Sequence, residues 1–369
     1  MIRAYTDSIE PRIYERKKAR IKGVKSWDID NLYPYHIENL NNQSGTAKSA
    51  TTLYKRFLKG NGFSQGDSLV NENQNLDQLF DLVLRDYSRF KGFALHISYD
   101  LLGGIKEVQH IPFKFVRFTE DESQVIVYDN WDLSKKRKIE KENFLYFDFY
   151  EPENALESLN NGSKGQVLYY SNDGTKNYPL ASIDAVVEDV LADYETKIFK
   201  LKNLQNGFML KGIFVYPEQE SQSEGVLDNQ EGIRGELKKF QGADGAQTMG
   251  MPYSGDIENL PVKYLPVQSN SNDKAFEYTE KSVRKSIIQH FNQPSTLHSE
   301  QEGGLFGKDQ FLEAYEIYNN FTHDDRMSLQ SQFNALFPLM GLNEDEIEVL
   351  TFRTYDTNIR ETERVSEDN

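Results

Sequence analysis

The chain has 369 residues, and 58 acidic side chains against 42 basic ones give it a formal net charge of −16. An acid excess of this size argues against a protein that grips nucleic acid over a broad basic face. The absence of cysteine excludes a disulfide scaffold, a Cys-ligated metal site and a Cys nucleophile, and it favours a reducing compartment. The length favours two or three folding units, because a single core seldom grows beyond roughly 250–300 residues.

The first 25 residues contain eight basic and three acidic side chains. We expect residues 1–26 to form a basic arm. A solvated, flexible terminus is the simpler interpretation, and a contact with an acidic neighbour or with DNA is the alternative. No apolar run approaches the ~20 residues of a membrane span and no signal-peptide block opens the sequence, so we expect a soluble, intracellular product.

Two amphipathic helices and then a β-rich stretch are expected after this arm. Apolar side chains at spacings of three and four predict helices over 44–59, with Ser44 or Thr46 as the N-cap, and over 75–91. The period then changes to two, which predicts an antiparallel β region with strands at 93–99, 108–118, 124–128 and 143–150. The basic turn at 135–138 is expected to be a charged hairpin tip that protects the sheet, and a DNA contact is the alternative.

Two long helices that enclose a small α/β segment follow. Apolar residues at helical spacing predict a helix over 180–205, about 39 Å long at 1.5 Å per residue, and a second helix over 273–291. The enclosed segment has strand-like stretches at 208–215, 246–253 and 260–267 and a short helix near 230–241. We therefore expect a small α/β module inserted between the two helices.

A polar, glycine-containing loop over 292–308 connects the second helix to a third. Loops of about 17 residues in compact domains are usually functional or disordered. The third long helix is expected over 309–337, because apolar residues continue at helical spacing up to Pro338. A strand is expected over 347–352, and the charged stretch that follows is expected to be poorly ordered.

The search for catalytic chemistry is mostly negative. The segment Gly303-Gly304-Leu305-Phe306-Gly307-Lys308 resembles a phosphate loop, but Asp309 stands where Ser or Thr should follow the Lys, and no strand precedes the glycines. His298 with Glu300, and His323 with Asp324 or Asp325, have no third metal ligand at a recognisable spacing. Solvated side chains are the better interpretation of these pairs.

Acidic clusters at 28–30 and 344–346 suit magnesium, but no Lys or His follows them at a spacing known from nucleases. We therefore expect no catalytic residues, no metal and no cofactor. An enzyme is the minority hypothesis.

Several stretches, spread over residues 27–340, carry a family resemblance. The first are Trp27-Asp28-Ile29-Asp30-Asn31-Leu32-Tyr33-Pro34, the helix from Ser44 to Gly62-Phe63, and Gly92-Phe93-Ala94-Leu95. The later ones are the helix end at Asn206-Gly207 before Leu210–Val215, and Ser286-Ile287-Ile288-Gln289-His290-Phe291-Asn292-Gln293-Pro294. In these stretches and in their order, the chain resembles the portal proteins of tailed bacteriophages.

The resemblance implies an α+β, portal-like fold whose helical crown is short or absent, since the chain ends soon after the third helix. Its expected parts are an N-terminal basic arm (1–26), a wing of helices and antiparallel β-structure (27–179), a stem helix (180–207), a small α/β clip (208–271), a second stem helix (272–291), a tunnel loop (292–308), a long helix with a closing wing strand (309–352) and a polar tail (353–369). The two long helices around a small module independently favour a stalk with a tip.

For function, the resemblance implies a structural ring, usually a homododecamer, at one capsid vertex. Double-stranded DNA is packaged and later ejected through such a head-to-tail connector. The implied partners are the terminase at the clip, head-completion and tail proteins, and the major capsid protein around the wing, with no membrane. The expected location is the virion, after assembly in the host bacterial cytoplasm. Because no phosphate loop is present, a separate terminase would hydrolyse ATP.

Charge indicates how such a ring would handle DNA. Twelve copies carry about −190 in total, so most of the wall would repel phosphates and let DNA slide. The tunnel-loop candidates are Gln293, Ser295, His298, Glu300, Glu302 and Lys308. We expect Glu300 and Glu302 to face the lumen and Lys308 or Gln293 to make a weak phosphate contact; the alternative is a loop that is disordered outside any channel.

Two rival hypotheses stay open. One is a metal-dependent nuclease or other DNA-processing enzyme that uses the acidic clusters and His323, which metal-stimulated DNA cleavage would support. The other is a different ring component of a tail or baseplate.

Overall fold

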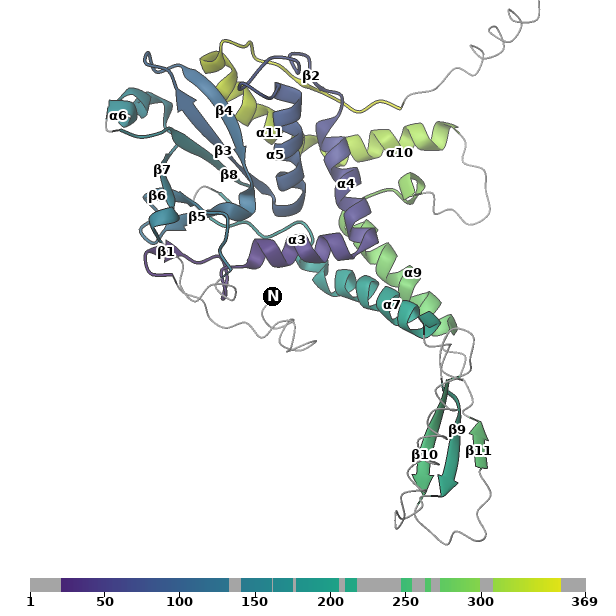
Figure 1. Ribbon diagram of the computed structural model, residues 1–369. Helices are drawn as coiled ribbons and strands as arrows, with labels where there is room; N and C mark the ends of the chain where they lie inside the picture. Colours follow the sequence, from purple (N-terminus) through teal and green to yellow (C-terminus); the bar gives the residue numbers. More distant parts are fainter. Residues whose placement is uncertain are drawn as a thin grey trace, which may run out of the picture. The chain divides into compact units, whose positions relative to one another are not determined.

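The computed structural model has an α+β fold that divides into two compact units (Figure 1). Unit 1 comprises Met1–Val190 and Ser286–Asn369, and unit 2 comprises Leu191–Lys285. The structure describes residues 21–132, 141–160, 162–174, 177–205, 210–217, 247–253, 263–266, 273–298 and 308–352. Four of the predicted features lie outside these residues: the basic turn at 135–138, the helix near 230–241, most of the N-terminal arm, and the tail from 353.

The centre of unit 1 is a seven-stranded sheet with the strand order β1-β5-β6-β7-β8-β3-β4. Its strands are β1 (Val24–Lys25), β3 (Gly92–Tyr99), β4 (Ile105–Ile111), β5 (Val116–Thr119), β6 (Gln124–Val127), β7 (Leu145–Phe149) and β8 (Gln166–Ser171). Neighbouring strands are antiparallel, except that β7 and β8 are parallel. The predicted antiparallel region is therefore present. Two strands that the period did not predict complete it: β1 adds an edge, and β8 lies between β7 and β3.

The strand expected over 108–118 is wrong as one element. β4 ends at Ile111, Pro112 follows, and residues 113–115 form a 3-10 turn before β5 begins. Pro112 has no N–H to donate to a ladder, and Phe113 N donates instead to the buried carboxylate of Asp86 (2.8 Å). This break carries the chain from the β4 edge of the sheet to the far side, where β5 lies next to β1.

Helices α4 (Gly45–Lys59) and α5 (Leu76–Phe90) form as the sequence predicts, because each has a side-chain cap and an apolar stripe. Ser44 Oγ accepts from Ala47 N (3.0 Å) at the start of α4. Asn75 and Gln78 form a capping box at the start of α5. Helix α3 (Tyr33–Gln43), which the sequence analysis did not predict, starts without a side-chain cap.

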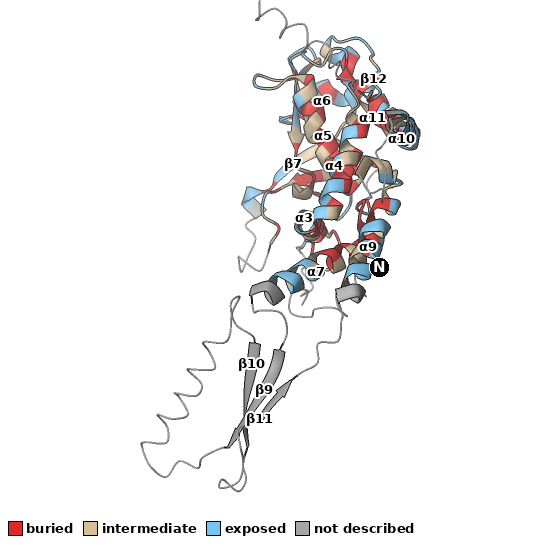
Figure 2. Ribbon diagram, turned by 90° about the vertical axis from the view of Figure 1, so that its right-hand side faces the viewer, coloured by how far each residue is buried: buried red, intermediate tan, exposed pale blue. Residues whose placement is uncertain are grey.

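An aromatic core joins α4 and α5 to the sheet and to α11 (His323–Leu336). The ring centroid of Phe63 lies 5.0 Å from that of Phe80, 5.5 Å from Phe333 and 5.2 Å from Phe337. Each buried phenylalanine contributes roughly 1.5–3 kcal/mol. Figure 2 shows the result on α4, whose inner face is buried and whose outer face is exposed.

The helix expected over 309–337 is two helices, α10 (Lys308–Phe321) and α11, separated at Thr322. Thr322 is buried, and its hydroxyl donates to the backbone oxygen of Tyr318 (3.0 Å). A hydroxyl that bonds back to the preceding turn competes with helix continuation. Figure 1 shows the two helices running in different directions.

The helix expected over 180–205 begins later, as α7 (Val187–Gln205) after a short 3-10 turn. Residues before this turn bond to other parts of unit 1 and not along a helix. Ala181 N donates to the Tyr33 hydroxyl (2.9 Å), and Ser182 N donates to Arg89 O (2.8 Å). Helix α9 (Asp273–His290) has the expected position.

Short elements complete unit 1. They are α6 (Ala155–Asn160), the 3-10 helices η3 (Pro152–Asn154), η6 (Ser295–His298) and η7 (Phe337–Met340), and the pair β2 (Gly62–Phe63) with β12 (Ile347–Glu348). Only two residues of the strand expected over 347–352 are paired. Gly60, between α4 and β2, has a φ of 58° and lies so close to Glu348 that a Cβ would sit 1.8 Å from its carbonyl oxygen.

Unit 2 contains a three-stranded sheet with the order β10-β9-β11. The strands β9 (Leu210–Pro217), β10 (Gln247–Tyr253) and β11 (Lys263–Pro266) match the predicted stretches; β10 is parallel to β9 and β11 is antiparallel. Within this unit, an ion pair between Lys200 and Glu280 joins α7 to α9. Across the described ranges, no helix combines the length and the apolar character needed to span a membrane.

Candidate functional site: the start of the loop after α9

The loop after α9 starts from a fixed polar contact. Asn292 has a left-handed backbone (φ 52°), and the side chain of Gln293 then enters unit 1, where the residue is 5% exposed. Gln293 Nε2 donates to the backbone oxygen of Ala50 in α4 (2.8 Å) and to the Tyr318 hydroxyl in α10 (2.9 Å). One amide therefore ties both α10 and the end of α9 to α4.

His298 supplies the hydrogen-bond partner of the oxygen of the Gln293 side chain. Its Nε2 lies 2.7 Å from Gln293 Oε1, and because a carbonyl oxygen only accepts, that nitrogen carries the hydrogen. Tyr318 packs its ring against Phe57, with centroids 4.7 Å apart, and burial raises the pKa of its hydroxyl. The hydroxyl therefore stays protonated at neutral pH while it accepts from Gln293.

The structure separates the six tunnel-loop candidates into two groups. Gln293 and His298 lie together at the start of the loop, and Ser295 is exposed on η6 between them. Lys308 is the first residue of α10, while its side chain and the residues Glu300 and Glu302 lie outside the described part of the chain. Their roles in a channel stay predictions, and a phosphate contact by Gln293 would require its internal hydrogen bonds to open.

The acidic clusters considered for metal binding serve as hydrogen-bond acceptors. Asp30 accepts from Leu32 N (3.0 Å) and lies 2.8 Å from His36 Nε2. Asp345 accepts from Ser64 Oγ (2.8 Å) and Gln65 N (3.0 Å). Among the residues that the structure describes, no group of three or more His, Asp or Glu side chains is placed to hold a metal ion.

Asp325, interpreted from the sequence as solvated, instead joins α11 to α4 and α5. Its carboxylate accepts from the Tyr54 hydroxyl, the Tyr87 hydroxyl (2.7 Å) and Lys91 Nζ (3.1 Å). Burial alone would raise the pKa of Asp325, but Lys91 and the two hydroxyls outweigh burial and hold the pKa below its usual range. His323 is exposed at the start of α11.

Arg117 in β5 is a fully buried charge among the residues that the structure describes, and the sequence patterns above do not predict its role. Its guanidinium donates to Asn31 Oδ1 (2.5 Å), Asn31 O (2.6 Å), Val116 O (2.7 Å) and Lys114 O (3.0 Å). It lies 5.3 Å from the ring of Trp27 and 5.1 Å from that of Trp131. The available signal was a basic residue inside the apolar run Val116-Arg117-Phe118 of a chain with only two tryptophans.

No protein-family model and no curated protein matches this sequence. Solved structures share its fold. A chain from the neck of an empty GTA particle, computed with C6 symmetry, has 12% identity and a TM-score of 0.53 over 89% of this chain and 87% of that chain. A chain from the virion of a native gene transfer agent (GTA) particle has 12% identity and a TM-score of 0.53 over 90% of this chain and 87% of that chain.

At this identity the likeness concerns the fold, and it extends over nearly the whole chain. A gene transfer agent is a tailed-phage-like particle, so these structural neighbours are consistent with the resemblance to phage portal proteins.

Proposed function

We propose that this protein is a structural subunit of the neck of a tailed-phage-like particle, and specifically of the portal ring through which double-stranded DNA passes. The observation that carries the proposal is the fold likeness to chains of a neck and a virion over 89% and 90% of the sequence. The sequence resemblance to portal proteins supports the same assembly.

The parts of the chain have natural roles in such a ring. Helices α7 and α9 both continue from unit 1 into unit 2, which suits two stem helices, and the small sheet of unit 2 suits the clip. The seven-stranded sheet with α3 to α5 suits the wing. In this proposal the clip docks the terminase and later a head-completion protein, and the wing meets the major capsid protein at one capsid vertex.

The loop 292–308 is proposed as the tunnel loop. Because Gln293 and His298 fix its start against α4 and Tyr318, the residues beyond them begin from a defined point. We assign Glu300 and Glu302 to the lumen, where they repel phosphates, and Lys308 to the weak phosphate contact. The net charge of −16 per copy supports a channel that lets DNA slide.

Negative-stain microscopy of the purified protein tests the assembly directly. The proposal expects rings with an axial hole and cyclic symmetry, and a protein that stays monomeric at all concentrations would contradict it. The same preparation should hydrolyse ATP and cleave DNA with divalent metal only at background rates. Metal-stimulated cleavage above background would instead favour a nuclease.

Reversing the loop charges tests the channel. The double variant Glu300→Lys and Glu302→Lys should slow or abort DNA packaging, because a basic constriction holds phosphates and stalls sliding. The matched control is Glu313→Lys with Glu316→Lys, an equal charge change at exposed positions of α10. Packaging of full-length genomes by the loop variant, measured by nuclease-protected DNA, would contradict the assignment of the lumen.

A further inference from the structure

Helix α4 has a basic outer face in a chain whose net charge is −16. Its charged residues are Lys48, Lys55, Arg56 and Lys59, and it has no acidic residue. Lys55 pairs with Asp81 (2.9 Å) and Lys59 with Asp77 (2.9 Å), both in α5. Arg56 is exposed, and its guanidinium makes no ion pair with any described residue. Arg56 is therefore a cation of this face that α5 does not neutralise.

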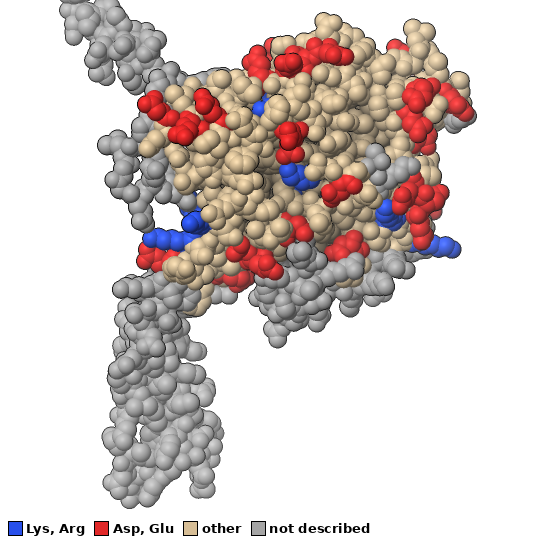
Figure 3. Space-filling view, turned by 180° about the vertical axis from the view of Figure 1, so that it is seen from behind, with Lys and Arg blue, Asp and Glu red and all other residues tan. Residues whose placement is uncertain are grey.

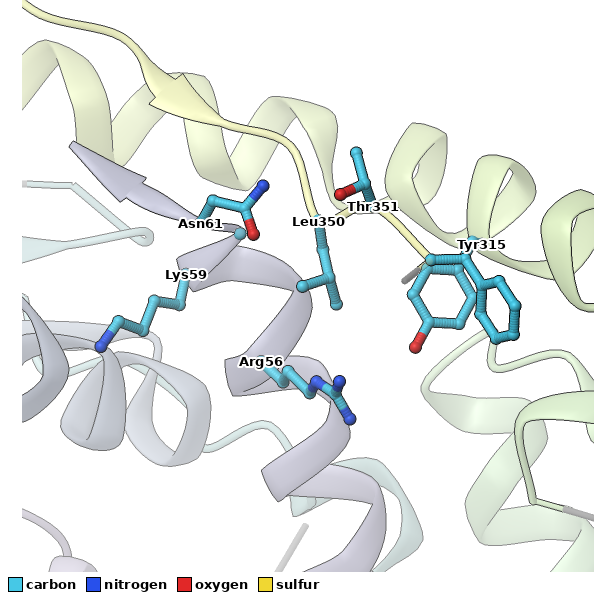
Figure 4. Close-up of a pocket in the computed structure, with 8 residues that line it drawn as sticks. Arg56, Lys59, Asn61, Tyr315, Leu350 and Thr351 are labelled. Carbon is cyan, nitrogen blue, oxygen red and sulfur yellow. The ribbon is translucent and has the colours of Figure 1, made fainter. Parts of the chain in front are cut away.

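Arg56 lines a pocket of about 460 Å³ between α4, α10 and the segment after β12. The lining residues are Arg56, Lys59, Gly60, Asn61, Tyr315, Leu350, Thr351 and Phe352. Figure 4 shows the Arg56 guanidinium extending into this space toward Tyr315, whereas Lys59 extends away from it. Of the two bases in this lining, Lys59 is paired with Asp77, so Arg56 is the cation that the pocket offers beside Tyr315, Leu350 and Phe352. This combination fits a carboxylate side chain on a partly apolar surface.

The complementary surface lies on the other side of unit 1. Glu151, η3 and α6 together contain three exposed glutamates, Glu151, Glu153 and Glu157, and no basic residue. Glu153 and Glu157 form no ion pair with a described residue. Beside them, Leu101 and Leu102 at the tip of the β3–β4 hairpin are 95% and 88% exposed, and Leu156 shares a pocket with both.

The two surfaces face different directions. Figure 1 shows α6 beyond one side of the sheet, and α4 and α10 beyond the other side. On the face seen from behind in Figure 3, the described surface carries several groups of acidic side chains and fewer basic ones. With a net charge of −16, each copy supplies many acidic side chains that a basic pocket of another copy can receive.

We propose that the Arg56 pocket of one copy receives Glu157 and the neighbouring α6 surface of the next copy in the ring. The inference rests on the proposed function and names the side-to-side contact of that ring. Two different surfaces on opposite sides of one unit make a head-to-tail contact, which is the type of contact that closes into a ring. The exposed leucines beside α6 supply the apolar area that one ion pair lacks.

A nucleic acid fits this surface less well than a second copy does. Asp77 and Asp81 already neutralise two of the four bases of α4. Affinity for a polyanion grows with each phosphate that a free cation neutralises, and the two remaining bases of this helix, Lys48 and Arg56, provide little of it.

Charge reversal with a mixing step tests the contact. Arg56→Glu and Glu157→Lys are each expected to raise the concentration at which half of the protein is in rings by at least tenfold, as measured by mass photometry. An equimolar mixture of the two variants is expected to assemble within about threefold of the wild type, because every contact in an alternating ring then joins opposite charges. Lys22→Glu, at an exposed base on neither surface, should assemble normally.

The stability and the assembly of the variants together test the proposed contact. Because both side chains are exposed, the variants should keep the thermal unfolding midpoint of the wild type. Rings formed by wild type and Arg56→Glu alike would overturn this contact and leave the proposed function standing. A mixture that assembles no better than the single variants would also overturn it, as would DNA binding by wild type that Arg56→Glu abolishes while ring assembly is unchanged. Absence of rings in the wild type would overturn both proposals together.

Discussion

Unit 1 stabilises charge in two different ways, at the fully buried Arg117 and at the half-buried Asp325. Arg117 is fully buried, and its hydrogen bonds go to an amide side chain and to backbone oxygens. Asp325 is held by the counter-charge of Lys91 and by two tyrosine hydroxyls. The first arrangement uses fixed dipoles and aromatic faces, and the second uses an ion pair.

The two arrangements differ in how they respond to pH. Burial lowers the pKa of Arg117 to about 10, so the residue stays charged at neutral pH, and its contribution to stability changes only at strongly alkaline pH. The pKa of Asp325 is held below its usual range. Its stabilising contribution is therefore complete above the unfolded value near ~4 and is lost as pH falls through the folded value.

The largest effect is expected for Arg117→Ala. The substitution leaves a cavity between two tryptophans and removes the donor from buried oxygens, so the free energy of unfolding should fall by about 4 kcal/mol. Urea unfolding of dilute, unassembled protein measures this loss. The control Arg56→Ala changes an exposed guanidinium and should stay within about 0.5 kcal/mol. Equal losses of stability for the two variants would contradict the conclusion that the hydrogen bonds of Arg117 stabilise the fold.

A smaller effect with a pH signature is expected for Asp325→Asn. The loss of the ion pair with Lys91 should lower the free energy of unfolding by about 2 kcal/mol at pH 7. Between pH 5 and pH 3 the wild type should lose part of its stability, and the variant should lose less. The exposed neighbour Asp324→Asn is the control and should keep the wild-type pH profile. If the free energy of unfolding falls equally with pH in the wild type and in Asp325→Asn, Asp325 does not contribute to the acid sensitivity of the protein.

The smallest of the three effects is expected at the start of the loop. Gln293→Ala removes the two hydrogen bonds that the amide donates and the one that it accepts from His298, at an expected cost of about 1.5 kcal/mol. Hydrogen exchange should become faster in η6 and the first turns of α10, because α4 no longer holds them. Gln289→Ala, at an exposed position one turn earlier, should leave exchange unchanged. Unchanged exchange in Gln293→Ala would mean that apolar packing alone fixes the loop start.

Elements with local signals were predictable from the sequence. Helices α4 and α5 have caps and apolar stripes within their own residues, and the strands of unit 2 are short apolar runs. The late start of α7 depends on distant partners, because the residues before it bond to Tyr33 and Arg89. No window of neighbouring residues contains that information. The breaks at Pro112 and Thr322 have local causes, which the spacing of apolar residues does not report.

The site shows the same limit. The sequence analysis names Gln293 as a tunnel-loop candidate for a weak phosphate contact. Its buried amide instead depends on Ala50 and Tyr318, which are far away in the sequence. The stretch from Trp27 to Pro34 was used as a family motif, and in the structure its Asn31 binds Arg117. A motif of this kind reports packing as readily as function. The predictions for Glu300, Glu302 and Lys308 stay untested.

The pairing of β2 with β12 means that the core of unit 1 can close only after nearly the whole chain has been synthesised. Asn61 N donates to Glu348 O (2.8 Å), so residues far apart in the sequence close the same core. During synthesis, Phe63 emerges long before Phe333 and Phe337, its partners, and contacts this distant in sequence form slowly. The Arg56 pocket needs Leu350 and Phe352 as well. A chain interrupted before these residues lacks both the closed core and the pocket, so incomplete chains are barred from assembly through the proposed contact.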